Sequence, residues 1–192
     1  MDGDSSQQPL RLTGDDPLSG LSAWLAEGRV DDAAAERTRQ RWLERQAAAD
    51  ATVAGVLLDL AERGSPVTVR TLGGRTARGR VAALGVDFVA VREPSRGDVV
   101  IPTGRVATVR TAPGEDPTVG DRPPTLDVAL VDALVELAVD RPPVLVSVAG
   151  DELRGDLHSA GTDVIALRLD AVPPSIVHVA IAALDHLVLR VG

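Results

Sequence analysis

The stretch Pro66-Val-Thr-Val-Arg-Thr-Leu-Gly73 returns later in the chain as Pro143-Val-Leu-Val-Ser-Val-Ala-Gly150. The segment after each copy is repeated too. Arg78-Gly-Arg-Val-Ala-Ala-Leu-Gly-Val-Asp87-Phe-Val-Ala-Val-Arg92 corresponds to Arg154-Gly-Asp-Leu-His-Ser-Ala-Gly-Thr-Asp163-Val-Ile-Ala-Leu-Arg168. The two copies stay in register apart from one residue deleted just before this segment. A repeat on this scale indicates two copies of one structural unit. It therefore decides the fold class before any local propensity does.

Each copy has the pattern of five short strands. From Val67 onward, apolar and polar residues alternate with a period of two, and turn residues such as Gly73-Gly74 separate the runs. In the second copy the predicted strands are 144–149, 153–160, 163–170, 175–181 and 185–191. Five short strands joined by tight turns are typical of a small barrel closed on itself.

A helical pattern precedes each run of strands. A short helix is predicted at 19–27, and one long helix from Asp31 to Arg63, where Gly64-Ser65-Pro66 ends it. Arg37, Arg41 and Arg45 share one face of its first half, which we interpret as a solvated face. A second amphipathic helix is predicted over 126–139.

We therefore predict an α+β, mostly β fold, in which two tandem helix-plus-five-strand barrels follow a long N-terminal helix. The predicted parts are a disordered segment at 1–20, a helical extension at 21–64, a first barrel at 65–111, a proline-rich linker at 112–125, and a helix with the second barrel at 126–192.

Composition narrows the class of protein. The chain has 192 residues, of which 44% are hydrophobic but only 2% aromatic, so its core is expected to be aliphatic. It has no cysteine, which excludes disulfides and thiolate chemistry. No apolar run is long enough to span a membrane, and the acidic, polar start does not resemble a signal peptide. We expect a cytoplasmic protein that does not bind membranes.

Charge is unevenly distributed along the chain. Residues 65–111 carry 8 arginines against 3 acids, a net charge of +5, whereas residues 1–64 carry −5 and residues 112–192 carry −8. The overall charge of −8 therefore hides a basic region in the first repeat. Such asymmetry concerns binding partners rather than the fold.

The repeat unit resembles the Sm-like fold, as in Hfq and the Lsm proteins. The sequence around Gly79 and the stretch Gly85-Val-Asp87-Phe-Val-Ala-Val are also similar to the C-terminal small barrel of the ribosome maturation factor RimP. The chain as a whole, including its Arg-Trp42-Leu-Glu-Arg-Gln stretch, looks like a group of actinobacterial proteins without an assigned role. The resemblance implies barrels with open strand edges, and hence a homo-oligomer, most simply a dimer.

The residues with which Sm-like proteins read RNA do not carry over to this chain. The turn aspartates are Asp87 and Asp163, but alanines occupy the positions three residues later, where the family has asparagine. The arginine–glycine pair of the later turn is replaced by Pro102-Thr103 in the first repeat. With no tyrosine and a single phenylalanine, platforms for base stacking are nearly missing.

Four arginines of the first repeat are the candidate binding residues. Alternation places Arg70, Arg78 and Arg80 on polar strand faces, where they would form one patch with Arg75 at the turn. Arginine forks suit phosphate oxygens, so this patch is a candidate nucleic-acid site. The alternative is that these side chains only keep an open face soluble.

Other polar residues have structural interpretations. Asp87 and Asp163 follow Gly-x at tight turns, where aspartate bonds to nearby backbone. The three histidines, at 158, 178 and 186, lack metal-ligand spacing and are expected at exposed strand positions. The sequence therefore predicts no catalytic residue, no metal and no cofactor.

Two functions are compatible with these features. The leading hypothesis is a non-catalytic module for protein interaction or assembly, with a protein partner that the sequence does not identify. The alternative is an RNA-binding regulator that uses the basic face of the first barrel, with weak, salt-sensitive binding.

Overall fold

The computed structural model describes residues 36, 38–43, 45–46, 49, 51–94, 96–114 and 126–190. The chain divides into two units, residues 1–46 and 47–192. In the first unit the described residues are helical and exposed, and Arg39 Nη1 lies 3.0 Å from the Glu36 carboxylate. The predicted disordered segment at 1–20, the helix predicted at 19–27 and most of the predicted linker lie outside the described residues.

The prediction of one helix from Asp31 to Arg63 is wrong. Thr52 has extended backbone angles, φ −117° and ψ 155°, and a new helix, α2 (Val53–Glu62), begins after it. The Thr52 hydroxyl accepts a hydrogen bond from the Gly55 N–H at 3.0 Å, which is the signature of an N-cap. The residues just before Thr52 include no glycine or proline, so the break is marked only by the capping residue itself. Gly64 ends α2 at φ 60°, as predicted.

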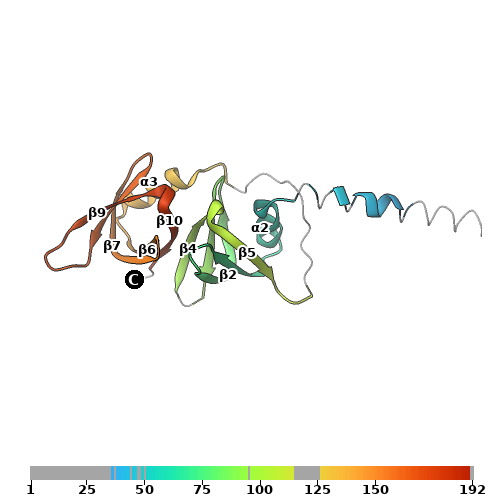
Figure 1. The fold of residues 1–192 in the computed structure, drawn as a ribbon, viewed down its shortest axis with the longest axis horizontal. Helices are drawn as coiled ribbons and strands as arrows, with labels where there is room; N and C mark the ends of the chain where they lie inside the picture. Colours follow the sequence, from blue (N-terminus) through green and yellow to red (C-terminus); the bar gives the residue numbers. More distant parts are fainter. Residues whose placement is uncertain are drawn as a thin grey trace, which may run out of the picture. The chain divides into compact units, whose positions relative to one another are not determined.

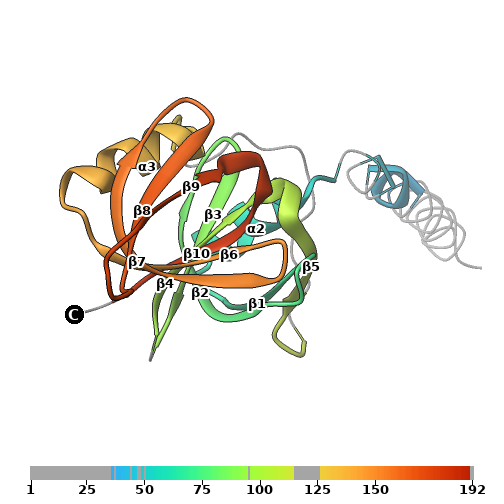
Figure 2. The ribbon, with the colours of Figure 1, turned by 60° about the vertical axis from the view of Figure 1, so that its left-hand side comes forward.

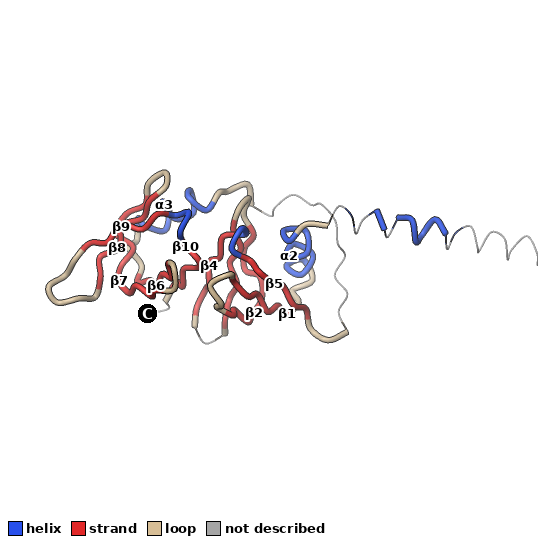
Figure 3. Tube along the Cα trace, viewed as in Figure 1, coloured by secondary structure: helices blue, strands red, loops and turns tan. Residues whose placement is uncertain are grey.

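Ten strands form a single antiparallel sheet (Figure 1). The first repeat supplies β1 (Pro66–Thr71), β2 (Thr76–Leu84), β3 (Phe88–Glu93), β4 (Gly97–Pro102) and β5 (Val106–Thr111). The second supplies β6 (Pro143–Val148), β7 (Asp151–Ala160), β8 (Val164–Leu169), β9 (Ile176–Ala180) and β10 (Leu184–Leu189). The helix that precedes β6 is α3 (Leu130–Val139), and the short 3-10 helices η1 (Thr103–Arg105) and η2 (Ile181–Ala183) precede β5 and β10 (Figure 3).

The prediction of two separate closed barrels is therefore wrong. The strands lie in the order β5-β1-β2-β3-β4-β10-β6-β7-β8-β9, an open sheet that runs through both repeats. The repeats are joined where β4 pairs with β10, with Val99 opposite Val188 and Val100 opposite Leu187. We call this pairing the joint. The alternation of apolar and polar residues predicts the strands, but it does not predict that an edge strand of one repeat pairs with an edge strand of the other.

Within each repeat the local structure is duplicated. Gly79 and Gly155 hold equivalent places, where a Cβ atom would collide with the carbonyl oxygen of Arg92 or Arg168 on the neighbouring strand. The backbone carbonyls of the two turn aspartates also make equivalent hydrogen bonds. Asp87 O accepts from Thr103 N, and Asp163 O accepts from Ile181 N, both at 2.8 Å.

The sheet carries two hydrophobic cores on opposite faces. In β3, Val89 and Val91 point into the core under α2, whereas Phe88 and Ala90 point into the core under α3. The joint alternates in the same way, because Val99 and Val188 belong to the α2 core and Val100 and Leu187 to the α3 core. Figure 2 shows the strands of the two repeats with α2 and α3 beside them. Two-sided burial explains the unbroken apolar runs in these strands.

We predict that the two repeats stay together when the chain is cut between them, because the joint and both cores hold strands of each. A site-specific protease sequence inserted between 115 and 125 should yield two bands on a denaturing gel. Size-exclusion chromatography of the cut protein should still show one species of the original size. Separation of the fragments without denaturant would contradict a continuous sheet.

Candidate functional site

Five arginines of the first repeat lie on one face of the sheet. Arg78 is opposite Thr68, which is also opposite Arg110, and Arg80 is opposite Arg92. Directly opposed residues share a face, as do residues two apart along a strand. The group therefore spans β5, β1, β2 and β3, and we call it the arginine face: Arg70, Arg78, Arg80, Arg92 and Arg110.

All five arginines of this face are exposed, and four of their side chains have no hydrogen-bond or ion-pair partner among the described residues. Arg92 is the exception, because its Nε and Nη2 each donate to the Asp98 carboxylate at 2.8 Å. This bidentate bond raises the pKa of Arg92 and holds the pKa of Asp98 below its ordinary value. Apart from Arg92, the arginine face is therefore a concentration of positive charge without ion-pair partners among the described residues.

The predicted patch is brought together only in part. Arg70, Arg78 and Arg80 share the arginine face, but Arg75 does not belong to it. The Arg75 guanidinium turns inward and pairs with the buried Glu93 carboxylate at 2.8 Å. Sequence reasoning missed Arg92 and Arg110, since placing them on this face requires the strand register.

A second cluster of polar side chains is buried at the joint. Asp185 Oδ2 accepts from the Thr71 hydroxyl at 2.6 Å, and its Oδ1 accepts from the Gly73 N–H at 2.8 Å. His186 Nδ1 lies 3.0 Å from Asp185 Oδ2. Thr71, Asp185 and His186 are 1%, 6% and 2% exposed. A Cβ atom at Gly73 would sit 2.6 Å from the Asp185 carboxylate, so glycine is required there. We call these four residues the aspartate clasp.

The aspartate clasp has the components of a hydrolase triad but not their order. In such a triad the histidine lies between the hydroxyl and the carboxylate, and takes the hydroxyl proton. Here Asp185 lies between Thr71 and His186, so the threonine hydroxyl donates to the carboxylate instead. His186 Nε2 is buried and has no partner among the described residues. This geometry fixes one repeat to the other rather than activating a nucleophile.

The three histidines differ in how far they are buried. The expectation of an exposed strand position is wrong for His186, whereas His178 is exposed and His158 is half-buried. Sequence gives no signal for the burial of His186, because its strand becomes internal only through the joint.

The clasp also controls the ionisation of its carboxylate. Burial alone would raise the pKa of Asp185, but hydrogen bonds from Thr71, His186 and the Gly73 N–H outweigh it, and the pKa lies below its ordinary value. The clasp therefore favours the charged form of Asp185.

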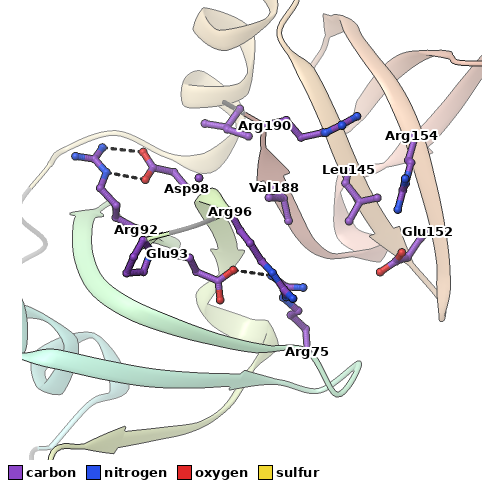
Figure 4. A pocket seen from close by; sticks show the side chains of 13 residues that line it. Arg75, Arg92, Glu93, Arg96, Asp98, Leu145, Glu152, Arg154, Val188 and Arg190 are labelled. Atoms are coloured by element: carbon purple, nitrogen blue, oxygen red, sulfur yellow. Dashed lines mark hydrogen bonds and ion pairs between the residues drawn. The ribbon is translucent and has the colours of Figure 1, made fainter. Parts of the chain in front are cut away.

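A groove of about 930 Å³ lies where the two repeats meet (Figure 4). The first repeat contributes Arg75 and the β3–β4 hairpin, and the second contributes β6, β7 and the end of β10. We call this the joint groove, and it is lined by Arg75, Arg92, Glu93, Pro94, Arg96, Gly97, Asp98, Leu145, Glu152, Arg154, Val188, Leu189 and Arg190. Sequence reasoning did not predict it, because its walls are more than 40 residues apart in the chain.

The two turn aspartates differ in role. Asp87 Oδ1 accepts from the Leu130 N–H at 2.6 Å, so this side chain caps α3 from the neighbouring repeat rather than bonding within its own turn. Asp163 has no side-chain partner among the described residues, and its exposed carboxylate faces solvent. The two carboxylates therefore form no pair.

Comparisons with protein families, curated proteins and solved structures found no match to this chain. The Sm-like resemblance thus rests on the residues of the repeat alone and stays a prediction. Within the described part of the chain, no group of three histidine, aspartate or glutamate side chains could hold a metal ion. Likewise, no described helix is long and apolar enough to cross a membrane.

We predict that Asp185→Asn destabilises the protein by about 2–4 kcal/mol, because it removes the buried charge and replaces one of the two accepting oxygens by an NH2 donor. Urea unfolding should show this loss at neutral pH, with Asp163→Asn as the exposed control, within about 0.5 kcal/mol of the parent. Because the pKa of folded Asp185 is depressed, its stabilisation is present above the unfolded pKa of about 3.9 and is lost as pH falls through the folded value. The difference between parent and variant should therefore shrink below about pH 4. Equal stability at pH 7 would contradict a stabilising clasp.

Proposed function

We propose that this protein is a non-catalytic binding module, and that its arginine face binds single-stranded RNA through the phosphate backbone. The observation that carries this proposal is the gathering of five exposed arginines on one face from four strands. Arginine forks form bidentate hydrogen bonds with phosphate oxygens, and a row of them suits a repeating anion.

The polar clusters of the described residues support binding rather than catalysis. The aspartate clasp is buried and has the wrong order for proton transfer to a nucleophile. The Asp87 carboxylate caps a helix. Each acid of the basic region therefore already has a structural contact, since Glu93 and Asp98 hold arginines.

Sequence preference in the bound RNA is expected to be slight. Phe88, the only phenylalanine, is buried between β3 and α3, and no aromatic side chain lies among the residues of the arginine face. Base stacking, which contributes about 1–3 kcal/mol per base in single-strand binders, is thus unavailable there. Affinity must come from phosphate contacts, which weaken as salt rises.

We predict weak RNA binding that depends steeply on salt. Titration of short U-rich and A-rich RNAs should give similar affinities, with a log–log salt slope of roughly −2 to −3 for three or four phosphate contacts. Changing Arg70, Arg78 and Arg80 to Glu should abolish binding.

The matched control changes three exposed arginines of the 126–190 part, Arg141, Arg154 and Arg168, to Glu and leaves the arginine face intact. This control should bind like the parent, apart from a small general effect of net charge. Tight binding that ignores salt, or a triple variant that binds like the parent, would contradict the proposal.

Self-assembly is a second candidate function, and the free strands of the sheet favour it. β5 and β9 are the two edges of the described sheet, and exposed edges are templates for pairing with another chain. In the repeat, β5 is the counterpart of β10, and β9 is the counterpart of β4. Since β4 and β10 pair with each other at the joint, β9 of one molecule could pair with β5 of the next in the same way. Such a homo-oligomer, most simply a dimer, and its location in the cytoplasm are both proposals.

The edges, however, lack features that make the joint strong. The counterpart of Val188 is Arg110, and the counterpart of Val100 is His178. The clasp is lost as well, because Ala107 stands in place of Asp185. Charged and polar edge residues oppose pairing, which is why the arginine face carries the leading proposal.

We predict that Arg110→Val together with His178→Val strengthens self-association, because it makes both edges resemble the joint. Light scattering across a concentration series should show a larger oligomeric fraction for this variant than for the parent. A parent that stays monomeric at high concentration, with a double variant that does the same, would contradict edge pairing.

A further inference from the structure

We infer that the joint groove is a binding site for a small organic phosphate, a ligand with a phosphate group at one end and an apolar or planar body. This site shares only Arg92 with the arginine face, and that side chain is already paired with Asp98. It requires both repeats, because its walls come from the two sides of the joint.

The charge that lines the groove fits an anion. Two of its five arginines are already paired, Arg75 with Glu93 and Arg92 with Asp98. The side chains of the other three, Arg96, Arg154 and Arg190, have no hydrogen-bond or ion-pair partner among the described residues and are exposed. Only Glu152 remains to offset them. The groove therefore offers a net positive charge that the protein itself does not neutralise.

The arginines also flank the groove on both sides. In Figure 4, Arg75 and Arg96 lie on the first-repeat side, while Arg154 and Arg190 lie on the second-repeat side. The pair with Glu93 fixes Arg75, and its Nε is buried without a hydrogen-bond partner among the described residues. Guanidinium groups on opposite walls suit a phosphate group, which presents several acceptor oxygens.

Between these walls the floor of the groove is apolar. Leu145 lies opposite both Val188 and Arg154 on its neighbouring strands, and Val188 lies opposite Val99 of the α2 core. The floor thus belongs to the α2-core face, whereas the arginine face is the other side of the first-repeat strands. An inorganic anion would leave this floor uncovered, so an organic body attached to the phosphate fits better. A volume of about 930 Å³ is in the range of small-molecule sites.

Calorimetric titration of the full chain at low salt tests this inference, with ADP as the probe and with adenosine and pyrophosphate as the two halves of its chemistry. ADP should bind at least about tenfold more tightly than either comparison ligand, because it alone satisfies both the arginines and the apolar floor. Arg154→Ala and Arg190→Ala should each weaken ADP binding roughly tenfold, as expected for losing a charge-assisted contact. Circular dichroism would verify that these exposed substitutions leave the fold intact.

Arg70→Ala is the matched control, since it removes an exposed arginine from the arginine face and should change ADP affinity less than about twofold. RNA binding by the groove variants separates this site from the proposed function: they should bind RNA like the parent. Absence of ADP binding at millimolar concentration would overturn the inference, as would pyrophosphate binding as tightly as ADP. An equal loss of ADP affinity in the Arg70→Ala control would also overturn it, because general charge would then explain the binding.

Discussion

The pairing of β4 with β10 is the contact on which the rest of this structure depends. It turns two five-strand repeats into one sheet and places an edge strand from each repeat in the interior. The strands at the joint are then covered on both faces, by the α2 core on one side and the α3 core on the other. Burial of apolar surface is the main stabilising term in folding, and here one pairing lets the same strands contribute to two cores.

Polar contacts fix the two repeats around that pairing. Asp185 of β10 reaches across to Thr71 and Gly73, and Arg105 donates to the Ala182 carbonyl at 2.7 Å. Asp87, in turn, caps the helix that belongs to the second repeat. Hydrogen bonds to a buried carboxylate are directional, so they specify this arrangement in a way that apolar strand contacts alone do not.

The repeats have diverged where only one of them takes part in these contacts. The clasp residue Asp185 corresponds to Ala107, and its hydrogen-bond donor Thr71 corresponds to Val148. The arginine face has diverged in the same manner, since Ser147 and Asp156 stand in place of Arg70 and Arg80. One repeat therefore carries the basic surface, while the other supplies the buried acid that holds the pair together.

The joint also sets the limit of what the sequence could reveal. Alternation, turn glycines and the repeat predicted ten strands close to where they lie, because these signals act within a few residues. They could not predict the joint, and they therefore missed the burial of His186, whose strand becomes internal only through that pairing. The cap formed by Asp87 and the inward turn of Arg75 were missed for a related reason, because their partners lie on other elements, 43 and 18 residues away, and no local pattern encodes them.

The scarcity of free carboxylates explains why the positive charge of the first repeat is available for binding. Residues 65–111 hold only three acids, and each already has a contact: Asp87 with the α3 N-terminus, Glu93 with Arg75, and Asp98 with Arg92. Since no free carboxylate remains among the described residues of this region, its other exposed arginines have no acid of their own repeat to offset them. The fold then separates them, with one group on the arginine face and Arg96 in the joint groove. The excess of arginines over acids in this repeat, together with the engagement of its three acids in local contacts, thus leaves unpaired arginines on two surfaces of an otherwise acidic chain.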